Sequence, residues 1–219
     1  MMMEELDLLK KNWHKDSHLQ NMFSEEDIYA MLQKKSSSVV KWIFYISLFE
    51  FGLGIVASFL LSLTKANDEA TTLLKKIGLY EFNLVLNVVI YSVVLFFIYR
   101  FYKMYSRINS EKNVKDLINS ILKTRKVVKQ YIAFNLTTLA IIIVFFGSYG
   151  ISESYSIIAS KNGELHSEMP IHLLLLGVLI LILIATFITV IAWFIYKLLY
   201  GILLKRLNRN YDELKKLDF

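Results

Sequence analysis

The chain has 219 residues, of which 55% are hydrophobic, and its mean hydropathy of +0.45 is too high for an ordinary soluble domain. It contains no cysteine, which excludes disulfide bonds, thiolate metal sites and cysteine nucleophiles. The net charge of +6 would suit a nucleic-acid partner in a soluble protein, but in a membrane protein the placement of charge matters more than its sum.

Residues 1–38 are expected to form cytoplasmic N-terminal helices. The opening residues are acidic and polar, so we expect no cleavable signal peptide. Ser24 followed by Asp27 resembles a capping box, which predicts a helix that begins near Glu25. No helix-breaking residue precedes the first apolar segment, so this helix is expected to run on into the membrane.

Four apolar segments follow, and each approaches the ~20 residues that a helix needs to cross ~30 Å of hydrocarbon. We assign the membrane spans to residues 39–64, 78–104, 129–152 and 171–197. The first span carries a carboxylate, Glu50, near its middle. The sequence therefore predicts an all-α fold, an integral membrane four-helix bundle with helical cytoplasmic extensions.

Residues 105–128, between the second and third spans, are expected to form a cytoplasmic amphipathic stem. Its apolar residues recur at helical spacing. They are Val114, Leu117, Ile118, Ile121 and Leu122.

Residues 198–219 are expected to continue the fourth span as a cytoplasmic C-terminal helix. Its apolar stripe consists of Leu203, Leu207, Tyr211 and Leu214. The helical extensions either pack together beneath the membrane or lie on anionic headgroups as basic amphipathic surfaces. Of these two arrangements, we favour mutual packing.

The 25 basic residues predict the orientation of the spans. Six lie in the segment that ends at Lys41, nine between Arg100 and Lys129, and six from Lys197 onward. The two remaining loops, Lys65–Lys76 and Ile151–Pro170, hold only four. Because loops rich in lysine and arginine stay in the cytoplasm, we expect both termini to be cytoplasmic and these two loops to lie outside.

Glu50 is expected to belong to an intramembrane polar layer. It lies nine residues from Lys41, so roughly 13–14 Å above the inner boundary at helical rise. Tyr91, Thr138 and Thr189 lie eight or nine residues from the inner charges of the other spans. No basic residue or histidine lies at this depth, so desolvation favours the neutral acid. Such a carboxyl either takes part in a proton or ion step or hydrogen-bonds across helices, and we favour the structural role.

The four histidines do not define a metal site. His14 and His18 have the i, i+4 spacing of a helical metal pair, but no third ligand lies at a convincing spacing. His166 and His172 fall on the opposite side of the membrane in the predicted topology. No phosphate-binding loop, dinucleotide fingerprint or nucleophile elbow is present. We therefore expect no metal, no cofactor and no catalytic residue, and lean towards a protein that is not an enzyme.

The stretches "EELDLLKKNW" and "SEEDIYAMLQKKSSSVVKWIFYISLFEF" resemble the opening of an uncharacterised family of small multi-span membrane proteins of Bacteroidota. The resemblance implies a multi-pass protein of the bacterial inner membrane. Members often carry the automatic label beta-carotene 15,15'-monooxygenase, which implies a carotenoid-cleaving oxygenase.

Three functions are open from the sequence. We expect a non-enzymatic regulatory or scaffolding subunit that binds a partner through its cytoplasmic helices, in one version as an anti-sigma-like protein. The alternatives are a small oligomeric transporter or channel with a polar layer around Glu50, and the carotenoid-cleaving oxygenase that the family label implies. The expected partners are the lipid bilayer and either another protein or further copies of the chain, but not nucleic acid.

Overall fold

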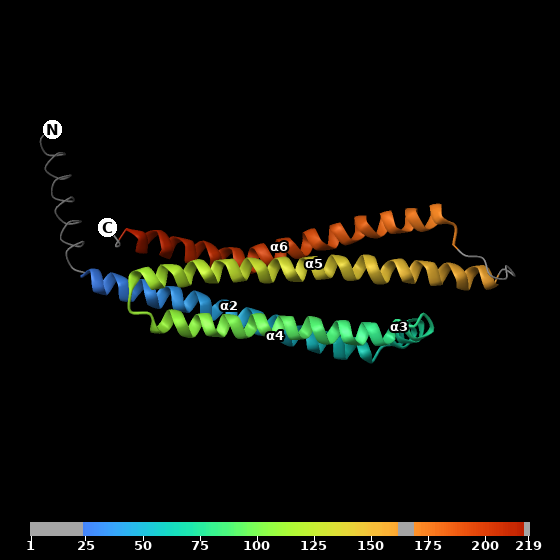
Figure 1. Ribbon diagram of the computed structural model, residues 1–219, viewed down its shortest axis with the longest axis horizontal. Coiled ribbons are helices and arrows are strands. Elements are labelled where there is room, and N and C mark those ends of the chain that lie inside the picture. The colour runs from blue at the N-terminus through green and yellow to red at the C-terminus, as the bar shows by residue number, and fades with distance from the viewer. Residues whose placement is uncertain (1–23, 162–168, 217–219) are drawn as a thin grey trace, which may run out of the picture.

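The structure is a computed structural model that describes residues 24–161 and 169–216. No β-strand occurs within these ranges, so the predicted all-α fold is confirmed. Residues 1–23, which carry the first part of the expected N-terminal helices, lie outside the described residues. The helices are α2 (Glu25–Ser62), α3 (Lys65–Lys76), α4 (Tyr80–Ser110), α5 (Val114–Lys161) and α6 (Ile171–Lys215), as Figure 1 shows.

Four helices, α2, α4, α5 and α6, are long and apolar enough to cross a membrane. The chain is therefore a membrane protein by the length and composition of its helices. α5 has 48 residues and α6 has 45, whereas ~20 residues suffice to cross the hydrocarbon. At ~1.5 Å per residue, each of these two helices extends beyond the hydrocarbon by about 40 Å in total.

The four long helices run alternately up and down the bundle (Figure 1). α2 packs on α4 and α6, and α5 also packs on α4 and α6, so the helices form a closed ring in chain order. The start of α2, the end of α6 and the α4–α5 turn lie at the same end, which we call the terminal end (Figure 1). The opposite end, which carries α3, is called the α3 end.

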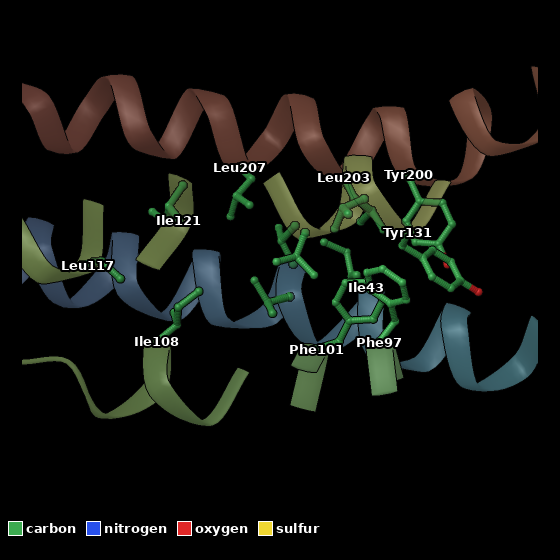
Figure 2. Packing of buried hydrophobic residues seen from close by; sticks show 14 of the residues in the cluster. Ile43, Phe97, Phe101, Ile108, Leu117, Ile121, Tyr131, Tyr200, Leu203 and Leu207 are labelled. Atoms are coloured by element: carbon green, nitrogen blue, oxygen red, sulfur yellow. The ribbon is translucent and has the colours of Figure 1, made fainter. Parts of the chain in front are cut away.

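The hydrophobic core lies in the half of the bundle next to the terminal end. Figure 2 shows its side chains interlocking from all four long helices. Its fully buried members include Ile43, Phe101, Ile108, Leu117, Ile121, Leu207 and Leu214. Nearer the α3 end, large apolar side chains such as Phe59 and Leu183 are more than 60% exposed, as expected of helices that face lipid.

α2 begins where the capping signal predicts. The Ser24 hydroxyl accepts a hydrogen bond from the Asp27 amide at 3.1 Å, and the Asp27 carboxylate accepts one from the Ser24 amide at 3.1 Å. The helix then continues without interruption to Ser62. The end of the expected N-terminal segment and the first span are thus one continuous helix.

The predicted stem is divided between two helices in the structure. Residues 105–110 continue α4, and residues 114–128 begin α5, with a short turn between them. Leu117 and Ile121 are fully buried against the other extensions, whereas Leu122 is 40% exposed. The described extensions therefore pack on one another through the face that contains Leu117.

α3 is a helix that the loop assignment of residues 65–76 does not anticipate. The Thr64 hydroxyl caps it by accepting a hydrogen bond from the Asn67 amide at 3.4 Å. Its apolar face, with Leu73 and Leu74, lines a pocket of about 380 Å³ against α4 and α5. Lys76 also forms an ion pair with Glu153 of α5, so α3 is attached to both pairs of helices.

Candidate functional site

Two features of the bundle are candidates for function. One is a carboxylate bound by three tyrosines, formed by Glu50, Tyr131, Tyr196 and Tyr200, which we call the Glu50 cluster. The other is the terminal platform, the part of the bundle formed by residues 24–49, 97–131 and 200–216. The Glu50 cluster lies at the inner edge of this platform. Figure 2 shows two of its tyrosines, Tyr131 and Tyr200, beside the core residue Phe97.

Glu50 of α2 is half-buried. Its carboxylate accepts a hydrogen bond from each of the three tyrosines. The Tyr131 hydroxyl of α5 donates at 2.8 Å. The Tyr200 hydroxyl of α6 donates at 3.3 Å, and Tyr196, one turn earlier on α6, donates to the other carboxylate oxygen. These bonds connect the α2–α4 pair to the α5–α6 pair.

Aromatic packing holds the three rings in place. Tyr196 and Tyr200 stack with ring centroids 5.9 Å apart, and Tyr131 meets Tyr200 at 6.0 Å. Tyr131 also packs edge-on against Phe97 and Phe101 of α4, each at 5.5 Å. Because edge-to-face contacts of this kind are favourable, the Tyr131 hydroxyl has a fixed position from which to reach Glu50.

Three hydroxyl donors converge on the Glu50 carboxyl group. A carboxylate is a pure acceptor with about four lone-pair sites, so it can take three hydroxyl donors at once. Among the ion pairs of the described residues, none involves Glu50, so in this part of the chain the tyrosines take the place of a cation.

The hydrogen bonds also fix the level of Glu50 in the bundle. Tyr131 is two residues from Lys129, and Tyr196 is next to Lys197, which are the charges that bound the third and fourth apolar segments. Glu50 is nine residues from Lys41. If Lys41, Lys129 and Lys197 lay at one level, Glu50 would lie about 10 Å further into the bundle than Tyr131. Because the two residues are bonded, α2 is shifted along the bundle by that distance. Glu50 therefore lies close to the membrane boundary defined by α5 and α6.

The other residues of the expected polar layer lie elsewhere. Tyr91 and Ser58 share a hydrogen bond at 3.0 Å that joins α4 to α2. Thr138 is half-buried on α5, about two turns beyond Tyr131. The buried Thr189 hydroxyl has no hydrogen-bond partner among the described residues. The structure thus pairs Glu50 with three tyrosines rather than with these residues.

Sequence reasoning selected Glu50 but not its partners. Tyr131 and Tyr196 lie beside boundary lysines, where tyrosine is common in any membrane protein as part of the aromatic belt. The available signal was the i, i+4 pair of Tyr196 and Tyr200 on α6, which places two hydroxyls on one helix face. His14, His18 and His166 lie outside the described residues. Within the described residues, no group of three side chains of the metal-ligating types occurs.

Polar contacts fasten the helices of the terminal platform. Tyr29 donates to the Glu111 carbonyl at 2.9 Å, and the Gln33 amide donates to the Ile108 carbonyl at 3.1 Å. These bonds satisfy carbonyls at the end of α4 that have no partner within the helix. Burial, together with the Glu111 carboxylate, raises the pKa of the Tyr29 phenol, so this donor keeps its proton at neutral pH.

A second polar contact joins α2 to α6. The Asn210 amide donates to the Ser36 hydroxyl at 3.1 Å, and both side chains are buried. Beside this contact a groove of about 450 Å³ opens between the two helices. Basic side chains line it, namely Lys35, Arg206 and Arg209, together with Ser38.

The fold and the hydropathy of its helices define an all-α membrane protein with four candidate spans. Among protein families, the chain belongs to that of the domain of unknown function DUF8845, whose model matches residues 26–219. Comparison with curated proteins finds no match. Comparison with solved structures also finds no match.

Proposed function

We propose that the protein is a non-enzymatic regulatory or scaffolding subunit of the bacterial inner membrane. In this proposal the terminal platform lies in the cytoplasm and binds an acidic segment of a partner protein. The observation that carries the proposal is the basic groove between α2 and α6, lined by Lys35, Arg206 and Arg209.

The charge distribution supports the orientation. Of the 25 lysines and arginines in the sequence, 21 lie in the N-terminal segment up to Lys41, in residues 100–129 and from Lys197 onward. Loops near the membrane that are rich in these residues remain in the cytoplasm. The terminal platform, with both ends of the chain, is therefore assigned to the cytoplasmic side.

The depth of the groove favours a protein rather than a lipid as its occupant. Arg209 lies twelve residues beyond Lys197 on α6, which is about 18 Å along the helix. Arg206 and Lys35 are exposed, and Arg209 has only a loose exposed contact with Glu213 at 3.7 Å, which contributes little. The groove thus presents positive charge well away from the membrane boundary.

The platform is rigid enough to present this groove in one shape. Its core side chains, such as Leu207 and Leu214, are fully buried against the other helices, so the groove lies on a packed scaffold and recognition in it rests on the basic side chains that line it. The contacts Asn210–Ser36 and Gln33–Ile108 cross between helices. The Glu50 cluster then connects this platform to the membrane half of the bundle.

Site-specific photocrosslinking in cells tests the proposal. A photoreactive residue at Ser38, which is exposed and lines the groove, should give one discrete protein adduct. The same residue at Ser154, exposed near the α3 end, should not give it. Lys35→Glu with Arg206→Glu should abolish the Ser38 adduct. Lys112→Glu in the α4–α5 turn with Lys115→Glu in the first turn of α5, both at exposed positions, should preserve it.

Two outcomes would contradict the partner-binding function. One is a Ser38 adduct that survives reversal of the groove charges while the variant remains folded. The other is an adduct with twice the mass of the chain, which would show that the groove faces a second copy.

A proton or ion step at Glu50 is the second candidate function. Two buried polar atoms, Asn135 Nδ2 and Thr189 Oγ1, have no hydrogen-bond partner among the described residues. Asn135 lies one turn beyond Tyr131 on α5, on the membrane side of the cluster, and Thr189 lies two turns from Tyr196 on α6. Unpaired polar groups along a helix interface can bind water, which would extend a polar path from Glu50 into the spans.

A further inference from the structure

A second groove lies between α4 and α5, on the other side of the bundle from the α2–α6 groove. Its volume is about 310 Å³. One end is basic and the other is aromatic. The side chains that line it include Phe96, Tyr99, Arg100, Lys103 and Lys123.

Three of the positive charges at this groove have no acidic partner among the described ion pairs: Arg100, Lys103 and Lys123. A fourth basic residue, Arg107, is already paired with Glu111 at 2.9 Å. The Arg100 guanidinium lies 5.7 Å from the centre of the Phe96 ring, a cation–π distance that holds it beside the aromatic end. The groove therefore concentrates uncompensated positive charge from two helices.

The groove lies at the membrane boundary. Phe96 and Tyr99 are 55% and 59% exposed and belong to the last turn of the apolar segment of α4. Arg100 is the first charge after that segment. Aromatic residues followed directly by basic residues are typical of the membrane–water interface. The α2–α6 groove, in contrast, lies further from the membrane.

We propose that the α4–α5 groove is a binding site for the headgroup of an anionic phospholipid. The phosphate oxygens accept hydrogen bonds from Arg100, Lys103 and Lys123, and the planar guanidinium of Arg100 can bind two oxygens at once. The acyl chains leave along the exposed rings of Phe96 and Tyr99. Basic pockets between helices at this depth bind acidic headgroups in membrane proteins.

Native mass spectrometry of the full-length protein tests this site. The protein is released from mild detergent after incubation with phosphatidylglycerol or with phosphatidylcholine. We expect wild-type protein to retain phosphatidylglycerol in preference to phosphatidylcholine. Arg100→Gln with Lys103→Gln and Lys123→Gln should weaken the retention of phosphatidylglycerol by about tenfold or more.

A matched variant of equal charge change is the control. Lys35→Gln with Arg206→Gln and Arg209→Gln removes three charges from the α2–α6 groove and should retain phosphatidylglycerol like wild type. Equal loss in both variants would overturn the site, because retention would then follow net charge alone. Equal binding of phosphatidylcholine would overturn it as well.

A thermal-shift measurement separates the lipid from its free headgroup. Phosphatidylglycerol should raise the melting temperature of wild-type protein, whereas inorganic phosphate at the same concentration should not. Stabilisation by phosphate alone would contradict a lipid site. If the triple variant fails to fold, Lys123→Gln alone provides the same comparison, because Lys123 is exposed and its loss should still lower retention severalfold.

Discussion

The Tyr131 hydroxyl donates a hydrogen bond to the Glu50 carboxylate across 2.8 Å, although the two residues are 81 positions apart. This bond connects α2 to α5 at the inner edge of the terminal platform. The Tyr131 ring is 1% exposed, so its position is set by packing rather than by solvent. The pair therefore reports directly on whether the two helix pairs are joined as the structure shows.

Tyr131→Phe should lower the free energy of unfolding by about 1 kcal/mol. This lies between the ~0.6 kcal/mol average of interhelical hydrogen bonds in membranes and the ~1.5–3 kcal/mol of bonds to charged groups. Tyr99→Phe is the control, because Tyr99 is 59% exposed and makes no hydrogen bond to Glu50. Thermal unfolding in detergent would measure both, and equal melting temperatures would argue against the Glu50 cluster.

Glu50→Gln and Glu50→Leu should differ clearly. The glutamine amide keeps the shape and can still accept and donate hydrogen bonds, so the expected loss is about 1–2 kcal/mol. Leucine leaves three tyrosine hydroxyls without their acceptor, and each costs about 1–3 kcal/mol if it stays unpaired. Glu50→Gln also tests the second candidate function, because an amide cannot carry a proton step. A Gln variant that folds yet loses cellular function would favour that step over a structural role.

Leu117→Asp should destabilise the platform strongly, by more than about 3 kcal/mol, because it places an unpaired charge in a closed core. Leu122→Asp is a matched control five residues along α5, at a position that is 40% exposed, and should cost at most about 0.5 kcal/mol. The melting temperatures of the two variants should be compared in detergent, because no bilayer surface is present there to contribute to stability. Similar effects at both positions would mean that the stem lies on lipid instead of on the other helices.

The Ser36–Asn210 contact should behave as a coupled pair. Asn210→Ala removes the donor from a buried hydroxyl and should cost about 1–3 kcal/mol. A double-mutant cycle with Ser36→Ala should give a coupling energy of about 0.5–3 kcal/mol. Additive single-variant effects would show that α2 and α6 are not joined at this point.

Gly147→Ala and Gly150→Ala should shift stability in opposite directions. A Cβ at Gly147 would lie 2.8 Å from a methyl group of Leu181 on α6, whereas nothing lies within 4 Å of one at Gly150. Alanine is favoured over glycine in a helix by about 0.5–1 kcal/mol, so Gly150→Ala should stabilise slightly. At Gly147 the forced shift of Leu181 should outweigh that gain. A gain of equal size at both positions would contradict the close approach of α5 and α6.

The all-α class and the choice of Glu50 as a candidate could be predicted from the sequence, because hydropathy and an isolated charge in an apolar segment are local signals. The register between helices is not local. Counting depth from Lys41 assumes that the boundary charges of all spans are level, and the bond between Glu50 and Tyr131 shows that they are not. The side-chain packing of Tyr131 on Phe97 and Phe101, which sets this register, involves residues that are distant in sequence.

The helix boundaries likewise divide into those that follow from nearby residues and those that depend on contacts distant in sequence. The start of α2 follows from Ser24 and Asp27, two residues three positions apart that cap each other. The division of residues 105–128 between α4 and α5 depends on a turn whose carbonyls are satisfied by Tyr29 and Gln33 of α2. Neither partner can be identified from the sequence of the turn itself.

The proposed cytoplasmic location of the terminal platform can be tested by cysteine labelling. The chain has no cysteine, so Ser110→Cys and Ser160→Cys each introduce one thiol at an exposed position at opposite ends of the bundle. An impermeant maleimide applied to intact spheroplasts should label the protein with Ser160→Cys, and should label the protein with Ser110→Cys only after permeabilisation. Labelling of Ser110→Cys in intact spheroplasts, with protection of Ser160→Cys, would contradict the account.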